Sequence, residues 1–553
     1  MTERRRWGRV APVAAVLIVG VLAGCVRIPL DGDVSTVAIA DIEGGDQLIV
    51  VPEGPVDGAS PREILRGFVL AGRGPQNGYE VATEFLTDAF ATEWWPSGGV
   101  IVTSSTFAPA EVAEDRLTLT VEASATLDSR GRYLAGEPTS HELDFEFELE
   151  EGQWRISAAP DGTVLSPASF DAIFSETSLY FWSPDFRYLV PEQRWFLDTR
   201  TVANRVVDEL LAADSAYVGT GVLVTAFPEG TERPESVDLV DGRASVTLSS
   251  EVLAASRQTQ SRMLAQLDWS LASLGDVDSA TIVAGGFPVG IESLDTIDRL
   301  QVGAAPIVMI DGTLGTLGTL AGESVVPLDA FGTALAGVEF DAFTLGRSGM
   351  DAAVLVGGVA GYATATGVET RDDRPGLAAP SLDPWGWLWS VPVDSPSGLM
   401  AFASGADART LALDQSGTIT ALRVSRDGTR LLAAVDGSGG TRVMVAGIAR
   451  TADLTPTALV DPVVIASGVR LLDAAWVSGT EIALLSASGA VNLVELGGQT
   501  VSLGAVSGAA HLAGGNAVEG LRVLDEAGQL WRHGGDVGWL EAADGISLLG
   551  VQQ

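Results

Sequence analysis

The sequence predicts a multidomain protein in which an α+β domain and an α/β domain precede a large all-β region. The chain has 553 residues, which at about 150 residues per domain suffices for three or four domains with their own cores. Its apolar fraction of 46% and charged fraction of 19% exclude a disordered acidic chain. Helical periodicity is confined to the residues before about position 300, and short strands recur after it.

The charge and the cysteine count argue against several classes of partner. The chain has 72 acidic residues against 33 basic ones, and its formal net charge is −39. Nucleic acids are bound through clusters of Lys and Arg, so we expect no nucleic acid partner. The single cysteine excludes a disulfide scaffold and any multi-cysteine metal site.

Residues 1–24 are predicted to be a signal peptide. A basic start is followed by an almost wholly apolar run that ends in Leu22, Ala23, Gly24 and Cys25. This ending resembles a bacterial lipobox, in which the cysteine is acylated and signal peptidase cuts before it. We therefore expect lipid attachment at Cys25, with palmitate-type acyl chains, and localisation on the extracytoplasmic face of the cell membrane.

An uncleaved anchor, or an ordinary secretory signal with an incidental cysteine, is the alternative at this end. The apolar run is shorter than the ~20 residues that cross a bilayer comfortably, which favours the signal peptide. Two or more acyl chains, at ~0.8 kcal/mol per buried CH₂, anchor stably where one would be marginal. Residues 25–45 are then the lipidated cysteine and a tether with scattered Gly, Pro and Asp.

Residues 46–165 are predicted to form the α+β domain. Ser60, Pro61 and Glu63 combine an N-cap serine, a proline at the first helical position and a glutamate three residues after the cap. The expected elements are two helices and then period-two strands, over residues 64–69, 81–90, 117–125, 143–149 and 154–156. Helices followed by a long antiparallel sheet resemble the NTF2-like or cystatin-like domains of exported proteins.

Residues 176–295 are predicted to form the α/β domain. Asp241 and Gly242 stand between two alternating runs, which is a strong signal for a two-residue hairpin turn. The other expected elements are strands at 179–182, 222–226 and 281–283 and helices from about 201 and over 263–271. This order resembles the GerMN domain of sporulation and germination proteins.

Residues 300–553 are predicted to form a β-propeller of roughly six blades. Short apolar strands recur about every 40 residues, as four-stranded blades do, and about 250 residues give roughly six of them. The clearest unit joins two strands through Ser425, Asp427 and Gly428. That turn resembles those of TolB-like blades, although Arg426 replaces their usual proline. An array of β-sandwiches is the alternative fold.

The lipobox, the GerMN-like domain and the C-terminal propeller, in this order, resemble the LpqB family of actinobacterial lipoproteins. The resemblance covers essentially the whole chain. It implies an accessory role to the MtrA–MtrB two-component system. The implied partner is an MtrB-like sensor histidine kinase ectodomain, and the implied processes are cell-wall homeostasis and division. Only Cys25 carries over as a residue with a known role.

The residues give no catalytic or metal-binding constellation. His141, His511 and His533 lie without a neighbouring cysteine or paired histidine. The nucleophile motif Gly-x-Ser-x-Gly does not occur, and a chain without lysine has no phosphate-binding loop of the lysine type. We expect a protein that is not an enzyme and that has no catalytic residues, no metal and no cofactor.

Clustered aromatic residues are the possible interface anchors, because exposed tryptophan carries disproportionate binding energy. The candidates are Trp182, Tyr188, Trp385, Trp387 and Trp389. Packing within a core or a blade is the simpler interpretation of the same cluster.

Two further functions stay open. The chain could be a lipoprotein that binds and delivers cell-wall glycan or a hydrophobic ligand, or one that acts on peptidoglycan through acidic residues. With 72 carboxylates in the chain, any acidic pair is nearly uninformative about glycoside hydrolysis.

Overall fold

The computed structural model describes residues 52–106, 108–294, 297–318 and 325–553, which belong to one compact unit. Leu22, Ala23, Gly24 and Cys25 lie outside the described residues, so lipid attachment stays a prediction. Among the described helices, none has both the length and the apolar character needed to span a bilayer. The multidomain class is confirmed, with two mixed domains followed by a β-propeller.

The predicted start of the first helix is confirmed in α1 (Pro61–Ala71). The amide of Glu63 donates to Ser60 Oγ, and the amide of Ser60 donates to Glu63 Oε2 at 2.8 Å. This reciprocal capping box satisfies two amides that a helix end leaves without partners. The apolar face that follows is buried in the domain core and comprises Ile64, Leu65, Phe68, Val69 and Ala71.

The second predicted helix is wrong as a continuous element. The chain forms two short helices, α2 (Glu80–Thr83) and α3 (Asp88–Ala91), with Leu86 bridged to Ile156 between them. The amide of Thr87 donates to the Ile156 carbonyl at 2.9 Å, and the Thr87 side chain then caps α3. Pairing with a strand therefore replaces the helical hydrogen bonds at this point.

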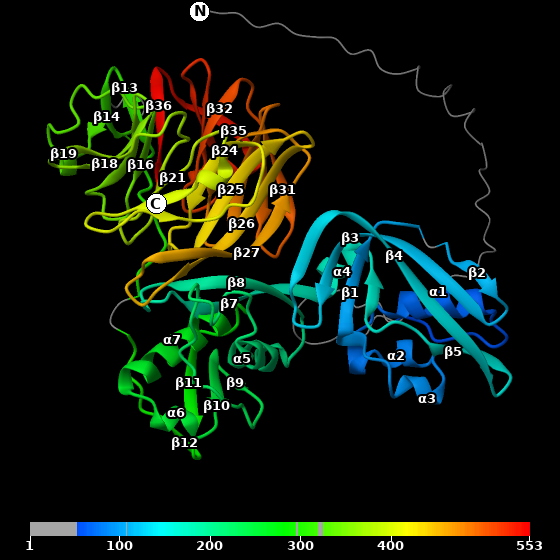
Figure 1. The fold of residues 1–553 in the computed structure, drawn as a ribbon. Coiled ribbons are helices and arrows are strands. Elements are labelled where there is room, and N and C mark those ends of the chain that lie inside the picture. The colour runs from blue at the N-terminus through cyan, green and yellow to red at the C-terminus, as the bar shows by residue number, and fades with distance from the viewer. Residues whose placement is uncertain (1–51, 107, 295–296, 319–324) are drawn as a thin grey trace, which may run out of the picture. The chain divides into compact units, whose positions relative to one another are not determined.

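The N-terminal sheet has the strand order β5-β4-β3-β1-β6, with β2 paired to β3. Its strands are β1 (Gly99–Thr103), β2 (Ala110–Ala113), β3 (Arg116–Asp128), β4 (Tyr133–Glu150), β5 (Gln153–Ala158) and β6 (Thr163–Leu165). Strand β3 alternates between buried and exposed residues as predicted. Strand β1, which was not predicted from the sequence, pairs antiparallel with β3 and parallel with β6. Helix α1 packs on the face formed by β3, β4 and β5 (Figure 1).

The middle domain combines a two-stranded hairpin, a four-stranded sheet and two longer helices. Its elements, after α4 (Pro167–Ile173), are β7 (Phe174–Trp182), β8 (Leu189–Leu197), α5 (Val202–Ala212), β9 (Asp238–Val240), β10 (Arg243–Thr247), α6 (Glu251–Ala254), α7 (Arg257–Ala272), β11 (Ser279–Ala284) and β12 (Phe287–Pro288). The sheet order is β12-β11-β10-β9, and β10 and β11 run parallel. The predicted strand at 222–226 is wrong, because only two isolated bridges occur there, from Leu223 to Val218 and from Val224 to Trp182.

The predicted hairpin turn of the middle domain is confirmed. Asp241 and Gly242 have φ values of 49° and 72°, the left-handed conformations that a tight hairpin turn between twisted strands requires. They connect β9 to β10 in antiparallel register.

The described residues of the propeller form six groups of four strands (Figure 1). The first group is β13 (Ile307–Ile310), β14 (Thr313–Thr316), β15 (Val326–Pro327) and β36 (Ile546–Gln552), and the second is β16 (Ala342–Leu345), β17 (Ala352–Val356), β18 (Val359–Thr364) and β19 (Gly367–Asp372). The third is β20 (Ser381–Leu382), β21 (Leu388–Ser390), β22 (Met400–Phe402) and β23 (Arg409–Thr410), and the fourth is β24 (Thr418–Val424), β25 (Arg430–Gly437), β26 (Gly440–Arg450) and β27 (Pro456–Ala466). The fifth is β28 (Leu471–Trp476), β29 (Glu481–Ser486), β30 (Ala490–Glu495) and β31 (Thr500–Ala505), and the sixth is β32 (Ala509–Ala513), β33 (Arg522–Asp525), β34 (Leu530–His533) and β35 (Trp539–Ala543).

The C-terminal strand closes the ring of blades. Strand β36 pairs antiparallel with β13 of the first blade and parallel with β16 of the second. Residues more than 200 positions apart therefore share one blade, an arrangement that a β-sandwich array does not have. The predicted propeller of roughly six blades is confirmed.

Arg426, which stands in place of the usual proline, connects three blades. Its guanidinium donates to the carbonyls of Trp476 and Val477 in the fifth blade and Gly515 in the sixth. Beside it, the buried carboxylate of Asp427 accepts from Ser425 Oγ at 2.8 Å and from the Thr429 amide at 2.9 Å. The turn thus satisfies the buried Asp427 carboxylate, while Arg426 links the neighbouring blades.

Candidate functional site

Aromatic and charged side chains gather where the middle domain meets the propeller. We call this place the junction and define it by Asp185, Arg187, Tyr188, Arg347, Trp385 and Arg450. Trp385 Nε1 donates to Asp185 Oδ2 at 2.8 Å. The rings of Trp385 and Tyr188 meet edge to face, with centroids 6.4 Å apart.

Each side of the junction is held by a turn that a polar side chain organises. After β7, Ser183 Oγ donates to Asp185 Oδ1 at 2.7 Å and accepts from the Tyr188 amide at 3.1 Å. In the propeller, Asp383 Oδ1 accepts from the amides of Trp385 and Trp387 at 3.0 and 2.8 Å. Such local bonds are the reason that Ser and Asp favour turns. These hydrogen bonds hold Asp185 and Trp385 in place, the two side chains that meet at the junction.

Cationic groups surround the Tyr188 ring. The guanidinium carbons of Arg187 and Arg347 lie 5.3 and 5.1 Å from its centroid, within cation–π range. Burial raises the pKa of Tyr188 to about 12, although both arginines oppose that rise. Arg187 is itself paired with Asp298 at 2.8 Å. The phenol therefore stays neutral and serves as an aromatic platform.

A buried ion pair supports the propeller side of the junction. Arg450 and Asp383 have fully buried side chains, and a terminal guanidinium nitrogen lies 2.6 Å from Asp383 Oδ2. The guanidinium also lies 4.3 Å from the centroid of the Trp385 ring, and Trp389 Nε1 donates to Asp383 Oδ2 at 3.2 Å. A pair of this kind specifies geometry more surely than it adds stability.

Four of the five candidate aromatics are buried. The exposed fractions are 0% for Trp182, Tyr188 and Trp389 and 5% for Trp387, which is the arrangement that the packing interpretation describes. Trp385 is half-buried and contacts both domains. The junction is therefore an interface within the chain, and partner anchoring by these residues stays a prediction.

A second contact joins the β7–β8 hairpin to the fifth blade. Gln193 Nε2 donates to Glu495 Oε1 at 3.1 Å, and Trp195 Nε1 donates to the Gly497 carbonyl at 2.8 Å. Burial, and then the nearby Glu495 carboxylate, raise the pKa of Glu176 to about 8. No sequence pattern predicted this contact, because nothing local links β7 to a strand about 320 residues later.

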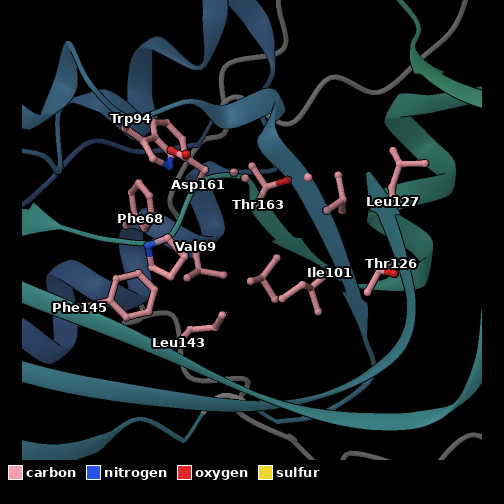
Figure 2. Close-up of a pocket in the computed structure, with 16 residues that line it drawn as sticks. Phe68, Val69, Trp94, Ile101, Thr126, Leu127, Leu143, Phe145, Asp161 and Thr163 are labelled. Carbon is pink, nitrogen blue, oxygen red and sulfur yellow. The ribbon is translucent and has the colours of Figure 1, made fainter. Parts of the chain in front are cut away.

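The N-terminal domain contains a cavity of about 160 Å³ between α1 and the sheet (Figure 2). Helix α1 contributes Phe68 and Val69, and β4 contributes Leu143 and Phe145. Trp94 stands beside Phe68, with ring centroids 5.0 Å apart. Figure 2 shows Trp94, Asp161 and Thr163 together along one side of the cavity. No local sequence signal predicted this cavity, because its walls come from five separate elements and the loops between them.

The histidines do not form a reactive group. His533 is buried against the Trp539 ring, with centroids 5.1 Å apart, and its Nδ1 accepts from the Gly535 amide at 3.3 Å. His141 and His511 lie on β4 and β32. Across the part of the chain that the structure describes, no three His, Cys, Asp or Glu side chains gather where they could hold a metal ion.

Three family models match successive parts of the chain. Residues 54–171 match the N-terminal domain of lipoprotein LpqB, and residues 302–548 match the LpqB β-propeller domain. Residues 178–290 match the Germane model, described as sporulation and spore germination. The order and positions are those of the three described domains.

Three curated relatives match over most of their length. Lipoprotein LpqB of Thermobifida fusca is 26% identical, covering 90% of this chain and 91% of the relative. Lipoprotein LpqB of Bifidobacterium longum is 27% identical, covering 78% and 77%. Lipoprotein LpqB of Mycolicibacterium smegmatis is 26% identical, covering 80% and 81%.

Solved structures match parts of the chain at low similarity. A putative TolB from Agrobacterium tumefaciens has a TM-score of 0.30 and 12% identity, covering 37% of this chain and 81% of its own. YCF48 bound to D1 peptide has a TM-score of 0.27 and 13% identity, covering 45% and 86%.

Proposed function

Because this chain belongs to the LpqB lipoprotein family, we propose that it is a lipid-anchored accessory protein of a sensor histidine kinase. It acts on the extracytoplasmic side of the membrane, by protein–protein contact and without catalysis. Through the kinase it affects cell-wall homeostasis and division. The partner is an MtrB-like kinase ectodomain.

The anchor in this proposal is Cys25. It is the one cysteine of the chain, and it directly follows the apolar run and Leu22-Ala23-Gly24. We expect Cys25→Ser to abolish acylation and membrane retention, which metabolic labelling with an alkyne fatty acid and fractionation would measure. Unchanged retention without acylation would contradict the anchor.

The observation that carries the proposal is the junction. The hydrogen bond from Trp385 to Asp185 joins the propeller to the Germane domain. Arg450 stacks on Trp385 from within the propeller and supports that contact. A second set of bonds, from Gln193 and Trp195, joins the same domain to the fifth blade. A partner that binds either domain can therefore bias the arrangement of both, which is how a non-catalytic accessory protein shifts an existing equilibrium.

In-cell photo-crosslinking from each domain tests the proposal. Exposed apolar positions suit the crosslinker because substitution there disturbs no core: Val112 in the N-terminal domain, Phe287 in the Germane domain and Val537 in the propeller are 62%, 75% and 70% exposed. We expect a histidine kinase ectodomain to be captured from Phe287 or Val537. Recovery of no kinase from any of the three positions would contradict the proposal.

Crosslinks to cell-wall glycan in place of a kinase would favour the glycan-binding alternative. A peptidoglycan-acting lipoprotein would instead release fragments from purified sacculi, and a single Asp or Glu substitution would abolish that release. We expect no release by the purified protein.

A further inference from the structure

We propose that the cavity of the N-terminal domain binds a small neutral molecule, a single ring with a short substituent that carries one hydrogen-bond acceptor. This site is independent of the kinase proposal, because its walls belong to the N-terminal domain alone. It lies between α1 and the strands β1, β3, β4 and β6 (Figure 2).

The size and the aromatic lining of the cavity favour a ligand with a single apolar ring. The cavity volume is about 160 Å³, and an apolar protein cavity of about 150 Å³ stays dry and binds benzene. Phe68 lies between Trp94 and Phe145, at centroid distances of 5.0 and 6.3 Å and with edge-to-face geometry. These aromatic rings offer faces and edges to a further ring.

Two donors without partners in the cavity wall favour a ligand that carries a hydrogen-bond acceptor. Trp94 Nε1 and Thr163 Oγ1 are buried and have no hydrogen-bond partner, and their residues are only 6% and 8% exposed. Buried polar atoms almost always have partners, and an unmade bond carries the full cost of desolvating its donor. A ligand carbonyl placed against this wall removes that cost. Both atoms are closed off from water, so binding includes a small adjustment of the indole or the threonine side chain.

The charge in the wall excludes an anionic ligand. Asp161 lines the cavity, and its Oδ1 accepts from the Trp95 amide at 2.9 Å. The lining contains no arginine or histidine that could pair with an anion. A carboxylate or phosphate would therefore meet a like charge and lose its hydration without compensation.

Two matched fluorinated probes test the site by ¹⁹F NMR on the full mature chain in lipid nanodiscs. The probes are 4-fluoroacetophenone and 4-fluoro-α-methylstyrene, which differ in a carbonyl oxygen against a methylene. We expect a protein-bound resonance for both, and about two- to tenfold tighter binding of the ketone, the ratio that one net hydrogen bond provides. Empty nanodiscs give the reference for partition into lipid.

Substitutions of residues that line the cavity test whether the probes bind there. Leu143→Phe fills the space and is expected to weaken both probes at least tenfold. Trp94→Phe and the isosteric Thr163→Val are expected to reduce the preference for the ketone. Thr177→Val is the control, because this buried threonine also lacks a partner but lies outside the cavity. Circular dichroism confirms that each variant folds.

The absence of a protein-bound resonance for either probe would overturn the proposal. Binding that Leu143→Phe leaves unchanged, in a variant that folds, would place the probes elsewhere and would also overturn it. Equal affinity for the two probes would overturn the proposal that the ligand accepts a hydrogen bond from the cavity wall.

Discussion

Two buried places in the molecule differ in how their polar groups are satisfied: the Asp383 carboxylate in the propeller and the cavity of the N-terminal domain. In the propeller, Asp383 accepts from the Arg450 guanidinium at 2.6 Å and from Trp389 Nε1, and both ion-pair partners are fully buried. In the N-terminal cavity, Trp94 Nε1 and Thr163 Oγ1 have no partner. Paired groups specify one packing arrangement, whereas unpaired donors in a cavity leave a hydrogen bond for a ligand to make. The ion pair at Asp383 fixes local structure, and the cavity is the place where we propose that a ligand binds.

The largest expected effect is the loss of the buried carboxylate in the propeller. Asp383→Ala leaves Arg450 uncompensated, and we expect it to lower the free energy of unfolding by about 3–5 kcal/mol. The matched control is Glu369→Ala, which breaks the Arg371–Glu369 pair, in which the glutamate side chain is 65% exposed. We expect the control to cost less than 1 kcal/mol. Denaturant unfolding followed by tryptophan fluorescence measures both, and similar small losses would contradict the role of the buried pair.

A moderate effect is expected at the junction. Trp385→Phe keeps a ring but removes the donor to Asp185, and we expect a loss of about 1 kcal/mol. The matched variant is Trp531→Phe, which removes the analogous bond to Asp525 within one blade. Only Trp385→Phe is expected to speed amide hydrogen exchange in residues 183–188 of the Germane domain. Equal exchange in the two variants would mean that the bond does not couple the domains.

The contact between the hairpin and the fifth blade is expected to weaken as the pH rises. Burial and Glu495 raise the pKa of Glu176 to about 8, with Glu481 contributing and Gln193 opposing. A carboxyl whose folded pKa lies above its unfolded value favours the folded state below the unfolded pKa, and this contribution is lost as the pH rises towards 8. Because Glu176 is partly exposed, we expect a decrease in Tm of only a few degrees between pH 5 and pH 9.

Glu176→Gln is expected to reduce this pH dependence, because the amide does not ionise. Differential scanning calorimetry at pH 5, 7 and 9 compares the two proteins. A Tm that falls equally in both would assign the pH dependence to other groups.

The smallest expected effect is a difference in the free energy of unfolding between two threonine variants of the N-terminal domain, one at a threonine with a hydrogen-bond partner and one at a threonine without. Thr163→Val removes an unpartnered buried hydroxyl, and we expect it to raise the free energy of unfolding by about 0.5–1 kcal/mol. Thr87→Val removes the hydroxyl that caps α3, and we expect it to lower that free energy by about 1 kcal/mol. Thermal unfolding measures both, and a loss in Thr163→Val would indicate that its hydroxyl has a partner after all.

Local signals predicted the elements whose partners lie nearby in the sequence. The capping box of α1 and the Asp241-Gly242 hairpin each depend on residues a few positions apart, and both are confirmed. Strand β1 was missed because it is short and its alternation breaks at Val102 and Thr103, where a register shift in the pairing with β3 leaves both residues buried. The helix at 81–90 was wrong because Leu86 pairs with Ile156, which lies 70 residues away.

The candidate site was harder to predict than the fold. The aromatic positions of the junction were singled out from their clustering, but their burial and their contacts within the chain depend on residues up to 200 positions apart, such as Asp185 and Trp385. The cavity could not be predicted from the sequence, because Phe68, Trp94 and Thr163 come from separate segments that only the fold brings together.

Kinase activity in a reconstituted membrane tests the central claim most directly. The partner kinase identified by crosslinking would be placed in nanodiscs, and its autophosphorylation rate would be measured with and without the mature lipoprotein. We expect the wild-type chain to change that rate several-fold and Trp385→Phe to change it less. An unchanged rate, with the lipoprotein present in the same nanodiscs, would contradict the account.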